Sequence, residues 1–108
     1  MQDVFQELYD VILDRRENPQ EGSYTCYLFE KGTDKILKKV AEESGETIIA
    51  AKNGVESETV GEISDLIYHL LVMMADQNIS LSAVEDELER RSQKIGNLKQ
   101  FHTANKDS

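Results

Sequence analysis

The spacing of hydrophobic residues along this chain predicts an all-α protein. Apolar residues recur every three or four positions in four long segments, which is the period of a helix that turns one face to a core. The predicted helices span residues 2–18, 34–53, 57–76 and 80–98, and a short helix is expected between Ser23 as N-cap and Gly32 as terminator. We therefore expect a four- to five-helix bundle.

Each long helix is expected to bury one apolar stripe. In the first helix the stripe is Val4, Phe5, Leu8, Val11 and Ile12; in the second it includes Ile36, Leu37, Val40, Ile48 and Ala51. Thr33 is the expected N-cap of the second helix and Gly54 its terminator, while Ser80 and Ser82 are alternative caps of the last. Residues 66–75 are apolar almost all round, which in so small a protein predicts a subunit interface.

Composition adds limits on function. The 108 residues contain 21 acidic and 12 basic side chains, a formal charge of −9. An acidic surface excludes a simple nucleic-acid binder, since the phosphate backbone demands cations. The sequence also lacks the polybasic patch through which proteins bind anionic lipids. The content of 39% hydrophobic residues argues against an acidic disordered chain.

Length and cysteine content narrow the class further. We expect one domain over residues 1–100 and a flexible C-terminal tail over residues 101–108. The single cysteine, Cys26, excludes an internal disulfide and a cysteine-based zinc site. The sequence shows no apolar run of membrane-spanning length and no signal-peptide pattern, which predicts a soluble, cytoplasmic protein.

Two clusters of acidic side chains are the candidate functional residues. Glu42, Glu43 and Glu46 lie within an arc of roughly 100° on the second long helix. Along the third long helix, one stripe beside the apolar face consists of Glu58, Glu62, Asp65 and His69. Acids at the edge of a core pay a desolvation cost unless something positive binds there. A solvated acidic face stays an open alternative, and a histidine in such a position is most often packed or hydrogen-bonded.

If the two helices are antiparallel, their carboxylates converge on a site suited to a hard cation. Mg²⁺ takes carboxylate oxygens, keeps waters and shares substrate phosphate, whereas zinc and copper prefer nitrogen or sulfur. Lys35 and Lys39 precede the acids on the same helix stripe and would soften their repulsion or reach a phosphate. No P-loop and no serine nucleophile elbow is present in the sequence.

The acidic motifs resemble those of a known superfamily. Glu42-Glu43-Ser44-Gly45-Glu46 followed by Glu62-Ile63-Ser64-Asp65 is similar to the EExxE…ExxD signature of the all-α nucleoside triphosphate pyrophosphatases of the MazG type. Within them the chain resembles the phosphoribosyl-ATP pyrophosphatase family, which acts second in histidine biosynthesis. That similarity covers about residues 8–91 and includes Ser23-Tyr24-Thr25, residues 65–72 and residues 87–91.

The resemblance implies an activity and a set of site residues. It implies hydrolysis of the α–β phosphoanhydride of phosphoribosyl-ATP with Mg²⁺, or Mn²⁺ as a substitute, by a homodimer or higher homo-oligomer. The implied metal ligands or water activators are Glu42, Glu43, Glu46, Glu62 and Asp65. The candidate substrate contacts are Ser23, Tyr24, Thr25, Lys35, Lys38, Lys39 and His69. Arg90 or Arg91 would reach a neighbouring subunit's site.

Two departures from the family pattern and two alternative functions accompany the resemblance. Gly45 interrupts the acidic helix, at a cost of about 1 kcal/mol against alanine. Many relatives are fused to a zinc cyclohydrolase, but this sequence has no Cys/His cluster, so a single activity is expected. The alternatives are a house-cleaning pyrophosphatase for noncanonical nucleotides and a non-catalytic helical dimerisation module.

Overall fold

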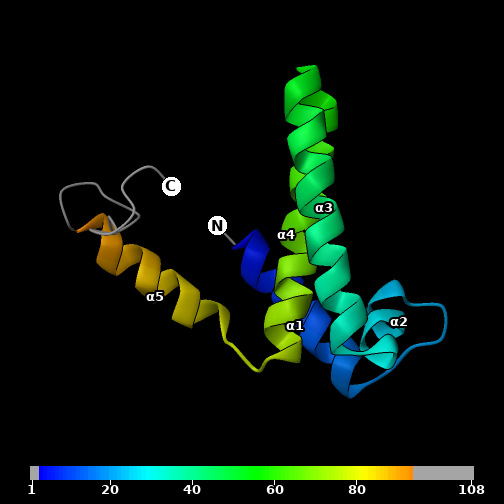
Figure 1. Ribbon diagram of the computed structural model, residues 1–108. Coiled ribbons are helices and arrows are strands. Elements are labelled where there is room, and N and C mark those ends of the chain that lie inside the picture. Colours follow the sequence, from blue (N-terminus) through cyan, green and yellow to red (C-terminus); the bar gives the residue numbers. More distant parts are fainter. Residues whose placement is uncertain (1–2, 94–108) are drawn as a thin grey trace.

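The computed structural model describes residues 3–93, which form five α-helices and, over that range, no β-strand. The helices are α1 (Val4–Glu17), α2 (Tyr24–Lys31), α3 (Thr33–Asn53), α4 (Glu56–Asp76) and α5 (Leu81–Ser92). Helices α3 and α4 form a long antiparallel hairpin, and α1 and α2 lie against its lower end (Figure 1). The predicted all-α fold is confirmed.

The two ends of the hairpin are closed by different devices. At the upper end Gly54 adopts the left-handed conformation (φ 76°, ψ 17°) that terminates α3, as predicted. At the lower end the Thr33 hydroxyl donates a hydrogen bond to Asp76 Oδ2 at 2.8 Å, which ties the start of α3 to the end of α4. The prediction that Thr33 is the N-cap of α3 is wrong. Gly32 holds that position, and the Thr33 side chain instead makes a hydrogen bond between α3 and α4.

The other helix starts follow ordinary capping chemistry. Asp3 caps α1, and Ser23 Oγ accepts a hydrogen bond from the Cys26 N–H at 3.2 Å, which confirms the predicted cap of α2. Of the two alternatives for α5, Ser80 is the cap, through the Ala83 N–H at 3.1 Å. Helix α5 ends at Ser92, and the predicted continuation to residue 98 and the tail over residues 101–108 lie outside the described residues.

The hydrophobic core lies where α1 and α2 meet the lower half of the hairpin. Its buried members are Tyr9, Ile12, Leu28, Ile36, Leu71, Val72, Met74, Ala75 and Leu81. Within the apolar segment 66–75, Leu71, Val72 and Ala75 are buried by the chain's own helices, whereas Leu66, Leu70 and Met73 are only half-buried. The subunit interface expected at this segment stays a prediction. The buried face of α1 also differs from the predicted stripe, because Tyr9 is buried while Val4 and Val11 are exposed.

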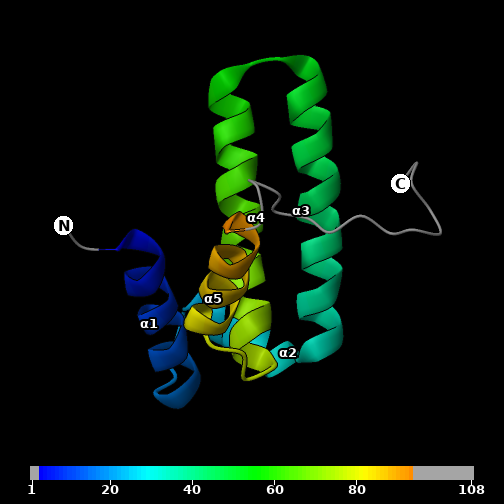
Figure 2. The same cartoon turned by 90° about the vertical axis from the view of Figure 1, so that its left-hand side faces the viewer.

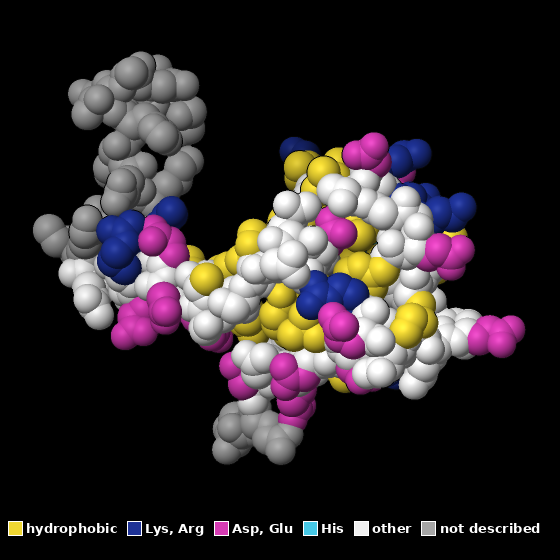
Figure 3. Space-filling model, turned by 90° about the horizontal axis from the view of Figure 1, so that it is seen from below, with side chains coloured by type: hydrophobic (Ala, Val, Ile, Leu, Met, Phe, Trp, Pro, Cys, Tyr) yellow, Lys and Arg dark blue, Asp and Glu magenta, His cyan; other side chains and the backbone are white. Residues whose placement is uncertain are grey.

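Two parts of the molecule extend beyond this core. Among the helices of residues 3–93, none other than α3 and α4 themselves lies beside the upper half of the hairpin (Figure 2). The exposed hydrophobic residues of this half are Ile48, Ile49, Val55, Val60 and Ile63. Helix α5 projects sideways from the body, as seen from the end of the bundle in Figure 3, and its Val84 and Leu88 are also exposed. Over residues 3–93 no helix has the length and hydropathy that a membrane crossing requires.

Candidate functional site

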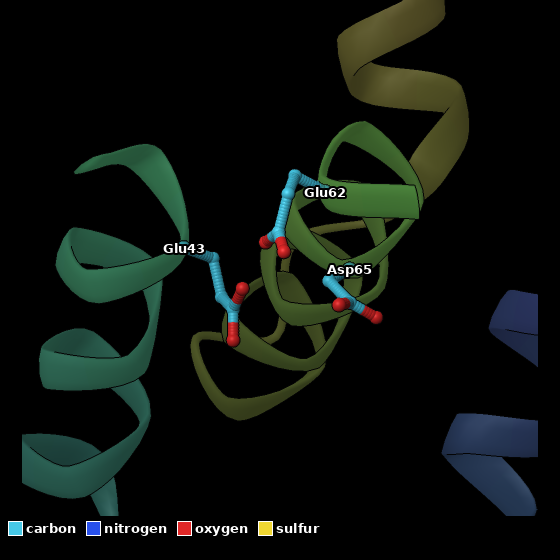
Figure 4. A group of neighbouring side chains, drawn as sticks. All are labelled: Glu43, Glu62 and Asp65. Carbon is cyan, nitrogen blue, oxygen red and sulfur yellow. The ribbon is translucent and has the colours of Figure 1, made fainter. Parts of the chain in front are cut away.

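Three carboxylates from the two long helices converge on one point halfway along the hairpin. Glu43 reaches across from α3 toward Glu62 and Asp65 on α4 (Figure 4). One oxygen from each of the three lies within 4.8 Å of the others, a spacing that one metal ion spans. The Thr47 hydroxyl lies 2.7 Å from the Glu43 carbonyl oxygen and 3.2 Å from that of Glu62, so it holds the helices together beside the cluster.

The cluster is a costly arrangement without a cation. The Glu43 residue is only 6% exposed, and the Oε2 atoms of Glu43 and Glu62 are buried with no hydrogen-bond partner. Buried acceptors without partners cost free energy, and three nearby negative charges add repulsion. A bound hard cation would satisfy these oxygens, so the donor set fits Mg²⁺ or a similar ion.

A fourth carboxylate, that of Glu46, lies beside these three. A hydrogen bond with Glu43, formed when one of the two carboxyls is protonated, and the charge of Glu43 raise the pKa of Glu46 above its ordinary value. Burial, followed by the charges of Glu46 and Asp65, raises the pKa of Glu62. These raised pKa values show that Glu43, Glu46, Glu62 and Asp65 interact as one cluster.

Glu42, the fifth predicted carboxylate, lies outside the group of three. Its Oε1 is 3.5 Å from the Lys39 ammonium, which also lies 3.6 Å from Glu43 Oε1. Burial acts to lower the pKa of Lys39, but the nearby Tyr24, Glu43 and Glu42 outweigh it and the pKa is raised. Lys39 is therefore a fixed positive charge at the edge of the cluster, where a phosphate oxygen would be attracted.

A groove of about 380 Å³ continues from the cluster toward the upper end of the hairpin. Its lining residues are Glu46, Ile49, Ala50, Asn53, Glu58, Gly61, Glu62 and Asp65. The mixture of apolar and polar walls is typical of a small-molecule site. The sequence did not predict that Ile49, Asn53 and Gly61 line this groove. Their residue types do not indicate a binding site, and only the packing of α3 against α4 brings them together.

The remaining candidates from the sequence are placed at the α2 side of the hairpin or along α3. Ser23 caps α2, and Thr25 is buried with its hydroxyl bonded to that of Tyr68. His69 is 4% exposed and hydrogen-bonded to the Tyr24 hydroxyl. Lys35 is half-buried on α3 and Lys38 is exposed.

Arg90 and Arg91 lie on the projecting helix α5. Arg90 Nη2 is 2.5 Å and Arg91 Nε 2.8 Å from Glu87 Oε2. Hydrogen bonds from the two guanidinium groups lower the pKa of Glu87 to about 2. Their predicted reach into a neighbouring subunit stays a prediction.

Comparison with known proteins agrees with the site. A family model described as phosphoribosyl-ATP pyrophosphohydrolase matches residues 5–92. A phosphoribosyl-ATP pyrophosphatase of Clostridium novyi is 54% identical over 97 residues, 90% of this chain and 88% of the relative. The enzyme of the same name from Listeria welshimeri is 59% identical over 92 residues, 85% of this chain and 88% of the relative.

A longer relative contains the same unit as one part. The histidine biosynthesis bifunctional protein HisIE of Lactococcus lactis is 51% identical over 105 residues, which are 97% of this chain and 50% of that protein. With this helical hairpin and its carboxylates, the chain belongs to the class of hydrolases that act on phosphoric anhydrides. Within that class the chain is a member of the phosphoribosyl-ATP pyrophosphohydrolase family.

Proposed function

We propose that this protein hydrolyses the α–β phosphoanhydride of phosphoribosyl-ATP to phosphoribosyl-AMP and pyrophosphate, as the second step of L-histidine biosynthesis. The observation that carries the proposal is the Glu43 carboxylate, buried without a partner for its Oε2 atom and directed at Glu62 and Asp65. Relatives more than 50% identical over most of their length bear the corresponding name. A cytoplasmic location accompanies the proposal as a prediction.

Magnesium is the proposed cofactor, with Mn²⁺ as a substitute. Glu43, Glu62 and Asp65 would hold the ion, and Glu46 would complete the cluster. When bound, the ion would neutralise charge on the phosphates and lower the pKa of an attacking water. An oxygen-only ligand set with room for phosphate is the kind that Mg²⁺ accepts.

The chain's own residues would supply orientation and charge. Lys39, held between Glu42 and Glu43, is placed to attract a phosphate oxygen at the edge of the cluster. The groove toward Asn53 and Ile49 would receive part of the nucleotide. A carboxylate of the cluster that does not ligate the ion would accept a proton from water, for which the raised pKa of Glu46 is suited.

The oligomeric state that we propose is a homodimer. The exposed hydrophobic residues at the upper half of the hairpin and along α5 support association, because their burial against a second copy would be favourable. The site lies next to the exposed part of the hairpin, so a partner would cover one side of the groove.

The test is incubation with phosphoribosyl-ATP and Mg²⁺, followed by chromatography of pyrophosphate and the nucleotide product. We expect phosphoribosyl-AMP from the wild type, and a loss of at least about 100-fold for Glu43→Gln and Asp65→Asn, since each removes a charged ligand. The helical circular dichroism should be unchanged. Retained turnover in both variants would contradict the assigned cluster.

Two further arms sharpen the test. Asp34→Asn is a matched control on the same helix; because Asp34 is an exposed acid in the first turn of α3, away from the cluster, we expect a change of less than about twofold. Competition against dUTP and ITP separates the proposed substrate from noncanonical nucleotides, since the ratio of kcat/KM values reports specificity. Preference for dUTP or ITP would favour the house-cleaning alternative.

A further inference from the structure

A buried histidine links the acidic helix α4 to helix α2. The His69 side chain lies four residues after Asp65 and is almost completely buried, with edge-to-face contacts to the rings of both Tyr24 and Tyr68. Both ring nitrogens are engaged: Nδ1 lies 2.7 Å from the Asp65 carbonyl oxygen, and Nε2 lies 3.1 Å from the Tyr24 hydroxyl. His69 is thus enclosed and has no nitrogen left for a substrate.

These contacts define which atom donates in each hydrogen bond. A backbone carbonyl only accepts, so Nδ1 of His69 carries the proton and donates to Asp65. The neutral imidazole then has a lone pair at Nε2, which accepts the proton of the Tyr24 hydroxyl. The only proton of that hydroxyl is therefore directed inward, and its oxygen can act toward solvent only as an acceptor.

The Tyr24 side chain stands at the edge of the carboxylate cluster. It is 45% exposed. Partial burial raises the pKa of its hydroxyl; the charge of Lys39 acts against this rise, and the charges of Glu43 and Glu42 add to it. Its ring has stacked contacts with both Tyr27 and Tyr68, with centroids 6.0 Å and 6.2 Å away, which limits its rotation. The hydroxyl oxygen is thus held in one place beside the proposed phosphate site.

We infer that His69 is a positioning residue that fixes Tyr24 as a hydrogen-bond acceptor for a ribose hydroxyl of the substrate. The inference rests on the proposed nucleotide substrate. An oxygen that offers only lone pairs repels a phosphate oxygen and pairs with a donor. In a nucleoside triphosphate, the donors closest to the phosphates are the hydroxyls of the ribose that carries them. Tyr24 would therefore select for that ribose, and His69 would act through Tyr24 without touching the substrate.

The experiment compares Tyr24→Phe with a matched pair of histidine variants. The amide of glutamine takes the place of Nε2 and keeps an acceptor for Tyr24, whereas that of asparagine takes the place of Nδ1 and does not reach it. We expect Tyr24→Phe and His69→Asn each to lower kcat/KM about five- to tenfold, mainly through KM, as for one hydrogen bond. His69→Gln should stay within about twofold of wild type, and the double variant Tyr24→Phe with His69→Asn should be no worse than either alone.

Analogues of the substrate separate positioning from a purely structural role. With the 2′-deoxy or the 3′-deoxy form of the triphosphate-bearing ribose, the wild type should lose the same factor and Tyr24→Phe should cost nothing more. An unchanged kcat/KM for Tyr24→Phe on the normal substrate would overturn the inference, and so would an equal effect of Tyr24→Phe on all substrates. If His69→Asn does not fold, the Tyr24→Phe comparison decides alone.

Nitrogen-15 spectra of the histidine ring test the hydrogen-bond directions without turnover. We expect a protonated Nδ1 and an unprotonated Nε2 in His69, with the Nε2 resonance shifted in Tyr24→Phe. The opposite tautomer would overturn the inference even if the enzyme is active. Absence of phosphoribosyl-ATP hydrolysis by the wild type would overturn the proposed function together with the ribose contact, whereas turnover that is indifferent to Tyr24 would overturn the contact alone.

Discussion

At the scale of single residues, the ionisation of Glu46 and Glu62 opposes folding of the metal-free protein. Both carboxyls have raised pKa values in the folded chain, from the neighbouring Glu43 and from burial respectively. A carboxyl whose pKa is raised in the folded protein stabilises the fold at pH values below 4.5, its pKa in the unfolded chain. That stabilisation is lost as the pH rises through the pKa of the folded state. Near pH 7 the cluster is therefore a net burden that a cation would relieve.

Glu46→Gln should consequently stabilise the metal-free protein at pH 7. We expect a higher Tm than that of the wild type in a chelator, because glutamine carries no charge toward Glu43, and a smaller difference near pH 4, where Glu46 is protonated. Added Mg²⁺ should raise the Tm of the wild type more than that of the variant. Thermal unfolding by circular dichroism measures both. Glu42→Gln is the control, and a lower Tm for Glu46→Gln at pH 7 without metal would contradict the account.

The identity of the acidic cluster could be predicted from the sequence, but its internal geometry could not. Glu43, Glu62 and Asp65 follow from helical spacing, since residues three and four apart share a face. Which way Glu42 turns depends on the position of Lys39 and on the rotation of α3 against α4, and both are set by packing. The hydrogen bond between His69 and Tyr24 likewise depends on where α2 lies, which helical periodicity does not specify.

At the scale of secondary-structure elements, the glycine within α3 and the glycine directly after it have opposite roles. Gly45 lies within the helix, and a Cβ added there would meet nothing within 4 Å in this chain. Gly54 has a φ of +76°, which L side chains rarely adopt, and so it allows α3 to end and α4 to begin. The first is a weak point of the helix, and the second is required by the turn.

Alanine substitutions at these positions should therefore shift stability in opposite directions. We expect Gly45→Ala to increase the free energy of unfolding by about 0.5–1 kcal/mol, the helix-propensity difference. Gly54→Ala should lower it by about 1–2 kcal/mol because of the left-handed backbone. Urea titration followed by circular dichroism measures both. A destabilising Gly45→Ala would show that a second copy packs against that position in the assembled protein.

The helix boundaries illustrate why some elements are easier to predict than others. Gly54 and Ser23 end and begin helices through local backbone chemistry that sequence alone reveals. Thr33 has the same local preference for capping, yet its hydroxyl donates a hydrogen bond to Asp76, which lies at the end of α4 beside the start of α3. A residue 43 positions away decided the outcome, and such a contact depends on the tertiary fold.

At the scale of the whole molecule, the core lies at the lower end of the hairpin, and the site extends from its middle toward the upper end. The buried cluster of apolar residues stabilises the lower half, where α1 and α2 pack, whereas the groove opens on the upper half. The sequence predicts a dimer interface at residues 66–75, and that stays a prediction, although Leu71, Val72 and Ala75 in this segment belong to the core of the chain. The exposed apolar side chains of the upper hairpin, among them Ile48, Ile49 and Val60, are a second candidate surface for the proposed dimer.

Ile48→Glu tests that interface. Ile48 is 65% exposed on α3, and its burial in a dimer would contribute about 1.5–3 kcal/mol, so a charge there should raise the dimer Kd at least about tenfold. Val4→Glu on α1, where the residue is 70% exposed, is the matched control and should leave the Kd unchanged. Sedimentation velocity over a range of concentrations measures the Kd. A wild type that is monomeric at all concentrations, or an equal shift in the control, would contradict an interface at the upper hairpin.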